Sequence, residues 1–375
     1  MAGSSADKII RRTPLTAGRA AIPPSEEDAA ALRQFSLQRL MGYSVEYSDA
    51  TELRAFVEAG MPWKDAAVAL AEQRIGRADH PDAPLLSSSR NDLLLRASAL
   101  FRMAQMMMLS DSPERFTLYR RAAELFAEAL HGRCERISIP TAAGSMAAWS
   151  LSPDDSGPRP GVLIVGGIEG WAMDLLGLGQ PLAERGLNVL MLDGPGQGET
   201  RFEYRHYLDR DWPAAYGAAI DTLLDMTAGA PVGVLGNSVG GGVAMLLAGR
   251  DRRVAACCNN GGLLVPLRQR ERKGFFPKVE AFCGPASAAE IEEIWEDFEI
   301  TAERMSLTCP LLIVQGGLDP LVSVEDSAQM LEWAGSADKQ MVVFDDGDHC
   351  IYNHPADKLA LVGDWFASRL AGAGA

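Results

Sequence analysis

The 375-residue sequence lacks paired cysteines, long apolar runs and an apolar leader, and each absence excludes a class of protein. Its six cysteines form no C-x-x-C pair, and the adjacent Cys257 and Cys258 suit neither a zinc knuckle nor an ordinary disulfide, so we expect reduced, buried thiols. No run approaches the roughly 18 apolar residues of a membrane span, so we expect no membrane partner. Residues 1–12 carry charges without an apolar stretch, so no signal peptide is expected and the default location is cytoplasmic.

Positive charge is scarce as well, with 35 Lys and Arg against 50 Asp and Glu and a net charge of −15. Residues 1–133 are balanced, so the acidic excess lies in residues 134–375. An acidic surface repels phosphate backbones, so no nucleic-acid partner is expected. The sequence has no G-x-x-x-x-G-K-[ST] motif and no His, Cys and Asp cluster with metal-ligand spacing, so we expect neither a cofactor nor a metal.

The hydrophobic pattern divides the chain into a flexible arm (1–25), a helical N-terminal domain (26–133) and an α/β domain (134–375). Helices are expected at 26–42, 51–59, 62–76, 91–109 and 113–131, with a Pro- and Ser-rich loop at about 79–89. Strands are expected at 136–140, 145–151, 161–165, 188–193, 232–236, 254–258, 311–315 and 340–344. An opening hairpin followed by alternating strands and helices predicts an α/β fold with a mostly parallel, doubly wound sheet. Residues 263–305 exceed one crossover and are expected to form an inserted cap over the sheet's carboxyl edge.

The segment 91–109 is apolar on nearly every face, so we expect it to be buried between other elements. Its side chains could line an adaptable apolar pocket or simply pack in a core, and plain core packing is the favoured interpretation. The candidates for substrate contact in this segment are Phe101, Met103, Met106 and Met107.

The strongest chemical signal is Gly236-Asn237-Ser238-Val239-Gly240, a G-x-S-x-G motif between a predicted strand and a predicted helix. A turn this tight needs small neighbours, and it lifts the Ser238 hydroxyl above the sheet at a helix N-terminus. The motif therefore predicts a nucleophilic serine.

A nucleophilic serine needs a base, and the base needs an acid that orients it. His349 lies in the loop after the last strand, and His354, before the final helix, is the second choice. Asp319 follows the strand at 311–315, which gives the chain order Ser238, Asp319, His349 that is typical of this fold class. Asp345, Asp346 and Asp348 are rival acids, and a solvated turn is the favoured interpretation for them.

The same chemistry needs N–H donors for an oxyanion. One is the backbone N–H of Val239, and the other is assigned to Ile168 in the loop Gly166-Gly167-Ile168-Glu169-Gly170-Trp171, with Gly167 as the near alternative. Glu169 and Trp171 could touch substrate or anchor the loop. Asp193-Gly-Pro-Gly-Gln-Gly198 resembles half a dinucleotide fingerprint, but without its third spaced glycine we interpret it as a tight turn.

These motifs together resemble the α/β-hydrolase superfamily over residues 134–375. The N-terminal segments Ala97-Ser-Ala-Leu-Phe-Arg-Met-Ala-Gln105 and Leu118-Tyr-Arg-Arg-Ala-Ala-Glu-Leu-Phe126 resemble the group of 2,6-dihydropseudooxynicotine hydrolase and the polyketide-shortening hydrolases. That resemblance implies a catalytic triad, a helical domain over the active site, probable homodimers and, in some members, cleavage of a carbon–carbon bond next to a ketone.

The expected function is therefore that of a serine hydrolase acting on a small carbonyl-containing molecule. One alternative is an acyl transferase or cyclase with the same triad, since some relatives in biosynthetic pathways catalyse such steps. A second is a binding protein on an inactive scaffold. The elbow residues Asn237 and Val239 vary among relatives, so the resemblance does not carry over a substrate.

Overall fold

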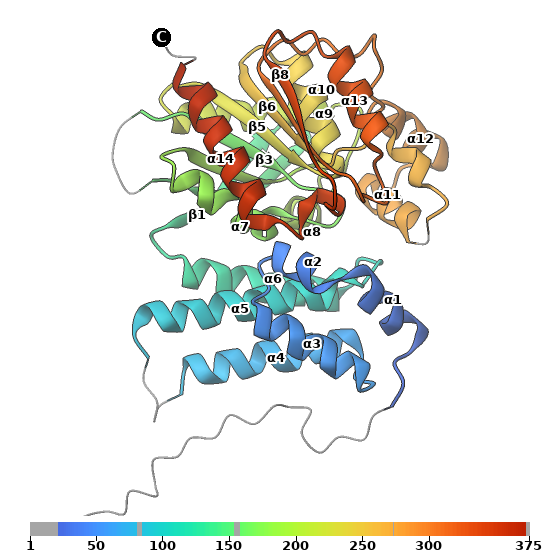
Figure 1. Ribbon diagram of the computed structural model, residues 1–375. Coiled ribbons are helices and arrows are strands. Elements are labelled where there is room, and N and C mark those ends of the chain that lie inside the picture. Colours follow the sequence, from blue (N-terminus) through green and yellow to red (C-terminus); the bar gives the residue numbers. More distant parts are fainter. Residues whose placement is uncertain (1–21, 81–84, 154–157, 273, 373–375) are drawn as a thin grey trace, which may run out of the picture.

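Eight strands of the α/β unit form one sheet in the computed structural model, which describes residues 22–80, 85–153, 158–272 and 274–372 (Figure 1). The strand order is β1-β2-β4-β3-β5-β6-β7-β8. The β1–β2 and β2–β4 pairs are antiparallel and all other neighbours are parallel, which confirms the predicted sheet. The strands are β1 (Cys134–Thr141), β2 (Gly144–Leu151), β3 (Gly161–Val165), β4 (Asn188–Asp193), β5 (Val232–Asn237), β6 (Val254–Asn260), β7 (Leu311–Gly316) and β8 (Lys339–Phe344).

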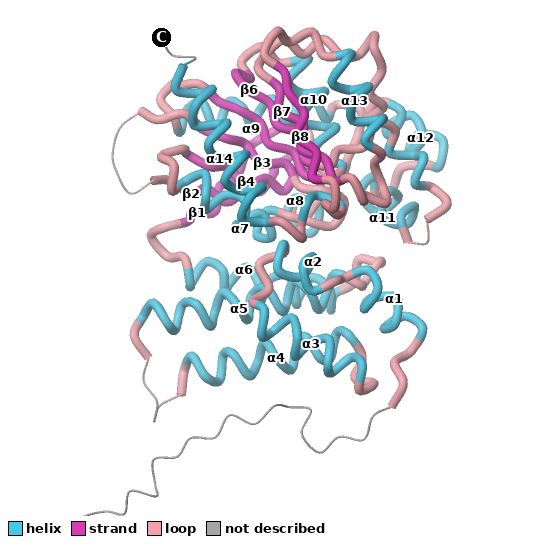
Figure 2. The backbone as a smooth tube through the Cα atoms, viewed as in Figure 1, coloured by secondary structure: helices cyan, strands magenta, loops and turns pink. Residues whose placement is uncertain are grey.

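Helices cover both faces of this sheet, as its uninterrupted apolar strands require (Figure 2). Val162 and Ile164 of β3 belong to a core that includes side chains of α7 (Leu176–Ala183) and α14 (Pro355–Gly372). Leu163 and Val165 face the opposite core, with α9 (Trp212–Met226) and α10 (Val239–Arg250). Short elements complete the unit: η2 (Ala172–Leu175), α8 (Gly198–Phe202), η3 (Pro266–Gln269), α11 (Phe275–Cys283), α12 (Ala288–Glu296), α13 (Val324–Trp333) and η4 (His349–Ile351).

Within residues 22–80 and 85–133, six helices form the helical region ahead of the sheet. They are α1 (Glu26–Gln34), α2 (Leu37–Gly42), α3 (Tyr47–Glu58), α4 (Trp63–Ala78), α5 (Ser87–Met106) and α6 (Pro113–Ala129). Every residue of α5 from Ala97 to Met106 is buried, so the expectation of a helix packed on all sides is confirmed. None of the helices in the described ranges is long and apolar enough to cross a membrane.

The single helix expected at 26–42 is instead two helices, and this prediction was wrong. The break falls at Phe35 and Ser36, where the Ser36 hydroxyl accepts a hydrogen bond from the Arg39 N–H at 3.1 Å and caps α2. A serine side chain that bonds the backbone in this way competes with helix continuation. At α1 the Ser25 hydroxyl accepts a hydrogen bond from the Asp28 N–H at 3.1 Å and caps the helix.

One hydrophobic core joins the helical region to the sheet. It contains Leu53 of α3 and Leu100 of α5 together with Ile164 of β3 and Phe366 of α14. Burial in a shared core couples the stabilities of the elements that line it. All six cysteines are free, and five of them are buried.

We therefore expect Leu100→Ala to destabilise the whole chain rather than the helical region alone. Leu100 is fully buried, and removing its side chain leaves a cavity that costs about 2–5 kcal/mol of unfolding free energy. Urea unfolding followed by circular dichroism and by loss of activity should give one transition at a lower midpoint in both signals. Leu86→Ala is the control, because that side chain is 79% exposed. An activity transition that keeps its midpoint would show that the two parts unfold independently.

Candidate active site

Ser238 occupies a strained turn between β5 and α10. Its φ of 57° and ψ of −130° lie in a region that non-glycine residues rarely adopt. A side-chain carbon at Gly236 would lie 1.9 Å from the carbonyl oxygen of Gly240, and one at Gly240 would lie 2.3 Å from that of Val165. The two glycines of the motif are therefore required by the close approach of the backbone.

His349 and Asp319 meet Ser238 at the carboxyl edge of the sheet. His349 Nε2 lies 2.9 Å from Ser238 Oγ, and His349 Nδ1 lies 2.8 Å from Asp319 Oδ2. His349 opens η4 after β8, Asp319 follows β7 and Ser238 follows β5, so parallel strands of one sheet bring together residues 30 and 111 positions apart. The structure thus assembles the three residues that the sequence proposed.

Asp319 is fixed by backbone donors. Its Oδ1 accepts from the N–H groups of Leu321 at 2.7 Å and Val322 at 3.2 Å, which leaves Oδ2 for the imidazole. The Asp319 side chain is 0% exposed and that of His349 is 13% exposed. Burial by itself lowers the imidazole pKa, but Cys350 and the Asp319 carboxylate outweigh it, so the pKa of His349 lies above its usual value.

The rival residues have other partners. His354 Nε2 lies 2.9 Å from Asp346 Oδ1, on the exposed side of the loop, and its ring stacks on Phe344. Asp348 Oδ1 accepts from the backbone N–H of Tyr352 at 2.6 Å and therefore stabilises the turn. No contact brings the second-choice base His354 to the serine in the described structure.

The Gly-rich loop, residues 166–171, runs directly beside the nucleophile. A side-chain carbon added to Gly167 would lie 2.8 Å from Ser238 Cβ and 3.3 Å from Ser238 Oγ. The backbone at Gly167 therefore lies close to the Ser238 hydroxyl, and Ile168 is the next residue of the loop. Val239, the other assigned donor, is the first residue of α10.

Gln197 braces this loop, and sequence reasoning missed that role. Its Nε2 donates to the carbonyl oxygen of Gly167 at 2.8 Å, and its Oε1 accepts from the Gly194 N–H at 3.0 Å. The Asp193–Gly198 segment is thus the expected tight turn, but it also positions the loop next to Ser238. The only signal for this role in the sequence was the presence of a polar side chain, Gln197, within the glycine-rich turn Asp193–Gly198.

The helical region holds the same loops from the other side. Tyr119 of α6 donates its hydroxyl to Asp193 Oδ2 at 2.8 Å, while Asp193 Oδ1 accepts from the Ala172 N–H at 2.8 Å. Arg102 of α5 forms a buried ion pair with Asp174 at 2.7 Å. Burial raises the pKa of Asp193 to about 6. These contacts tie the geometry beside Ser238 to α5 and α6.

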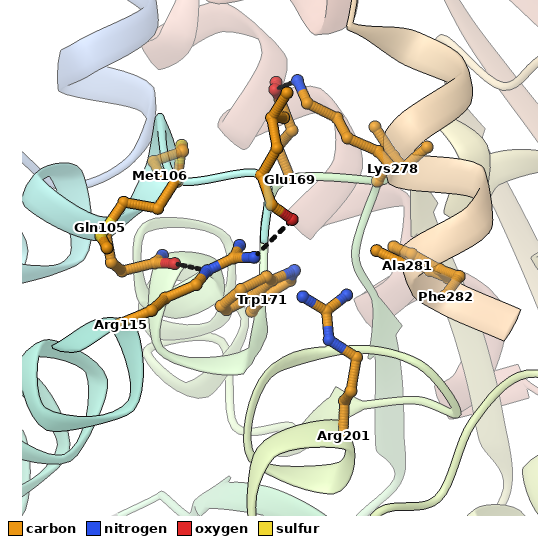
Figure 3. A pocket seen from close by; sticks show the side chains of 12 residues that line it. Gln105, Met106, Arg115, Glu169, Trp171, Arg201, Lys278, Ala281 and Phe282 are labelled. Carbon is orange, nitrogen blue, oxygen red and sulfur yellow. Dashed lines mark hydrogen bonds and ion pairs between the residues drawn. The ribbon is translucent and has the colours of Figure 1, made fainter. Parts of the chain in front are cut away.

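Three of the proposed substrate-contact residues, Glu169, Trp171 and Met106, line a small cavity (Figure 3). Phe101 and Met103 are buried in the core, Met107 packs against it, and none of the three is among the described residues that line this cavity. Glu169 accepts from Gln34 at 2.6 Å and pairs with Arg39 and Lys278. The full lining is Gln105, Met106, Met108, Leu109, Arg115, Ile168, Glu169, Trp171, Arg201, Lys278, Ala281 and Phe282.

Metal-ligating side chains do not gather anywhere in the described part of the chain: no three His, Cys, Asp or Glu residues are placed to hold an ion. The groups that meet at Ser238 are its hydroxyl, the His349 imidazole and the Asp319 carboxylate.

The chain is similar in sequence and in fold to known hydrolases. A relative from Paenarthrobacter nicotinovorans, 2,6-dihydropseudooxynicotine hydrolase, is 28% identical over 344 residues, which cover 87% of this chain and 89% of the relative. A crystal structure of the 2,6-dihydroxy-pseudo-oxynicotine hydrolase superposes with a TM-score of 0.78 at 25% identity, over 90% of this chain and 97% of that one. AbyA5 shares the fold, with a TM-score of 0.73 at 18% identity over 92% and 95% of the two chains.

The resemblance drawn from the sequence motifs is thereby confirmed. The model of the alpha/beta hydrolase family matches residues 161–360, which is more than half of the sequence and includes all three residues that meet at the elbow. The chain belongs to the alpha/beta hydrolase family.

Proposed function

We propose that this chain is a serine hydrolase that cleaves an ester, or a carbon–carbon bond next to a ketone, in a small carbonyl-containing substrate. The observation that supports this most strongly is the continuous series of hydrogen bonds from Ser238 through His349 to Asp319 at the elbow. Similarity to 2,6-dihydropseudooxynicotine hydrolase over most of both chains supports the choice of small organic substrates.

In the proposed first step, Ser238 Oγ attacks the substrate carbonyl carbon and His349 Nε2 takes the hydroxyl proton. Asp319 holds the Nδ1–H of the ring, which keeps Nε2 free to accept and stabilises the imidazolium that forms. The carbonyl oxygen becomes an oxyanion, which the N–H groups of Val239 and of Ile168 or Gly167 stabilise.

Collapse of this intermediate breaks the bond to the leaving group and leaves an acyl group on Ser238. The imidazolium of His349 returns its proton to the leaving atom, an alkoxide oxygen for an ester or an enolate carbon for a ketone. Water then attacks the acyl-enzyme with His349 as base, and a carboxylic acid is released with Ser238 restored. No cofactor enters this sequence of steps.

Reaction in H₂¹⁸O tests the proposal against the acyl transferase or cyclase alternative. With p-nitrophenyl acetate and with a 1,3-diketone as probes, hydrolysis places one ¹⁸O atom in the carboxylic acid product. Products that form without ¹⁸O, or only when an acceptor alcohol or amine is present, would contradict hydrolysis. If a fluorophosphonate probe formed no covalent adduct with Ser238 and neither probe substrate were cleaved, the result would favour the inactive binding scaffold.

Asp319→Asn should lower kcat by about 10⁴-fold, because an amide at this position favours the wrong imidazole tautomer. The backbone N–H groups of Leu321 and Val322, which donate hydrogen bonds to Asp319 Oδ1, also lose their charged acceptor. Steady-state kinetics on the same ester measures the loss. Asp346→Asn is the matched control, since its side chain is 73% exposed and pairs with His354. Equal activity of the two variants would remove Asp319 from the proposed triad.

A further inference from the structure

The small cavity beside the Gly-rich loop receives cationic and indole side chains from four separate parts of the chain. Arg115 comes from α6, Trp171 ends the loop, Arg201 lies on α8 and Lys278 lies on the cap helix α11. Figure 3 shows the Arg115 and Arg201 guanidinium groups near the Trp171 indole, and the Lys278 side chain directed toward the Glu169 carboxylate. None of these four residues takes part in the mechanism proposed above.

Two buried donors at this cavity make no hydrogen bond to any other described residue. They are Arg201 Nε and Trp171 Nε1, on side chains whose residues are 2% and 4% exposed. Buried polar groups are normally paired, because leaving them unpaired costs free energy. Other buried indole nitrogens of the described chain also lack a partner, but Trp171 shares its cavity with an unpartnered arginine nitrogen.

Positive charge is concentrated around these donors. The Arg115 and Arg201 guanidinium carbons lie 5.3 Å and 5.7 Å from the Trp171 ring centre. Both arginines therefore make cation–π contacts with the same indole ring. Burial and the neighbouring Arg201 charge lower the pKa of Arg115 to about 9. Like charges held this close in a buried site favour the binding of an anion.

The nearby carboxylates are too few to balance these cations. Asp111 is shared by Arg201 at 2.8 Å and Arg115 at 3.4 Å. Glu169 is shared by Arg39 and Lys278. Three guanidinium groups and the Lys278 amine, whose pKa burial lowers to about 7, therefore share two carboxylates, in a chain whose net charge is −15. This excess of positive charge stands out against the acidic composition of the α/β unit.

We propose that this cavity is a subsite for a carboxylate carried by the substrate, which accepts hydrogen bonds from Trp171 Nε1 and Arg201 Nε and lies near the Lys278 ammonium. The inference rests on the proposed hydrolase function and names its substrate class: carbonyl compounds with a carboxylate a few bonds from the scissile carbonyl. A carboxylate suits the site because the cavity is small and its donors include a guanidinium.

The Gly-rich loop connects the subsite to the nucleophile. Gly167 lies against Ser238, and the next two residues, Ile168 and Glu169, line the cavity. In the proposed complex, a substrate that presents its carbonyl to Ser238 would pass Ile168 to place its polar end in the cavity. Binding energy from such a remote group orients the reacting carbonyl.

The test compares two series of p-nitrophenyl esters. One contains the half-esters of succinic, glutaric and adipic acids, and the other contains the neutral esters of butyric, valeric and hexanoic acids. The wild-type chain should prefer a carboxylate-bearing ester in kcat/KM. Trp171→Phe, which keeps the ring and removes one donor, should lower that preference about tenfold, and Arg201→Gln should lower it about 100-fold. Arg120→Gln is the control, since Arg120 is 58% exposed and pairs with Glu203 outside this cavity.

A binding measurement separates failure of the subsite from failure of the hydrolase proposal. Free glutarate should raise the Tm of the Ser238→Ala variant in a saturable way, and adding Trp171→Phe should reduce that rise. Hydrolysis of neutral esters with no carboxylate preference and no Tm shift would overturn the subsite and leave the function standing. A glutarate-dependent Tm shift without any ester or diketone hydrolysis would support the subsite and overturn the function.

Discussion

Ser238→Ala should lower kcat by a factor on the order of 10⁶ and leave only the catalysis that oxyanion donors and binding provide. Ser238 Oγ is the atom that lies 2.9 Å from His349 Nε2, and its strained backbone is held by glycines on both sides. Alanine retains the Cβ atom, so the elbow should keep its shape while it loses the nucleophile. The measurement is steady-state hydrolysis of p-nitrophenyl acetate, with circular dichroism to verify folding.

Ser368→Ala is the matched control, because Ser368 is exposed on α14 and far in sequence from the elbow. It should hydrolyse the ester at the wild-type rate. Undiminished turnover in Ser238→Ala would contradict the proposed nucleophile, whatever the control shows.

His349→Ala should cause a loss of the same order as Ser238→Ala, about 10⁶-fold in kcat, because a nucleophile and its base act as one unit. The variant removes both hydrogen bonds of the imidazole, to Ser238 and to Asp319. The double variant Ser238→Ala, His349→Ala should therefore be scarcely slower than either single variant. Single-turnover kinetics on the same ester measures all three.

His354→Ala provides the comparison, since it lies five residues away in the same loop and pairs with Asp346. It should retain nearly full activity. A larger defect in His354→Ala than in His349→Ala would show that the base had been assigned to the wrong histidine.

The central part of the site was predictable from sequence because its determinants are local. An apolar strand, a G-x-S-x-G turn and a helix follow one another within residues 232–250, so tight backbone geometry alone selects Ser238. Asp319 follows the buried strand β7 and His349 follows the half-exposed edge strand β8, and parallel strands place their carboxyl ends at one edge. The alternating pattern indicates a mostly parallel sheet, whereas the order β1-β2-β4-β3-β5-β6-β7-β8 was not predicted from it.

The surroundings of the site could not be predicted, because they depend on packing between distant segments. Glu169 pairs with Arg39, 130 positions away, and with Lys278, 109 positions away. No periodicity or spacing encodes such contacts. Segment 91–109 illustrates the same limit. An apolar surface on nearly every face of a helix indicates that the helix is buried. It does not indicate which side chains line a cavity, as Met106 does, and which pack in the core, as Met103 does.

The break between α1 and α2 was missed for a different reason. Ser36 can continue a helix or cap the next one, and the choice is set by the packing of Phe35 in the core that joins the helical region to the sheet. Local propensity does not contain that information.

Covalent labelling tests the central claim most directly. The wild-type chain is incubated with a fluorophosphonate probe, digested and examined by peptide mass spectrometry, with Ser238→Ala and His349→Ala treated in parallel. We expect one adduct, on the serine of Gly236-Asn237-Ser238-Val239-Gly240, that does not form in Ser238→Ala and forms much more slowly in His349→Ala. No adduct on the wild-type chain, or an adduct that persists in Ser238→Ala, would contradict it.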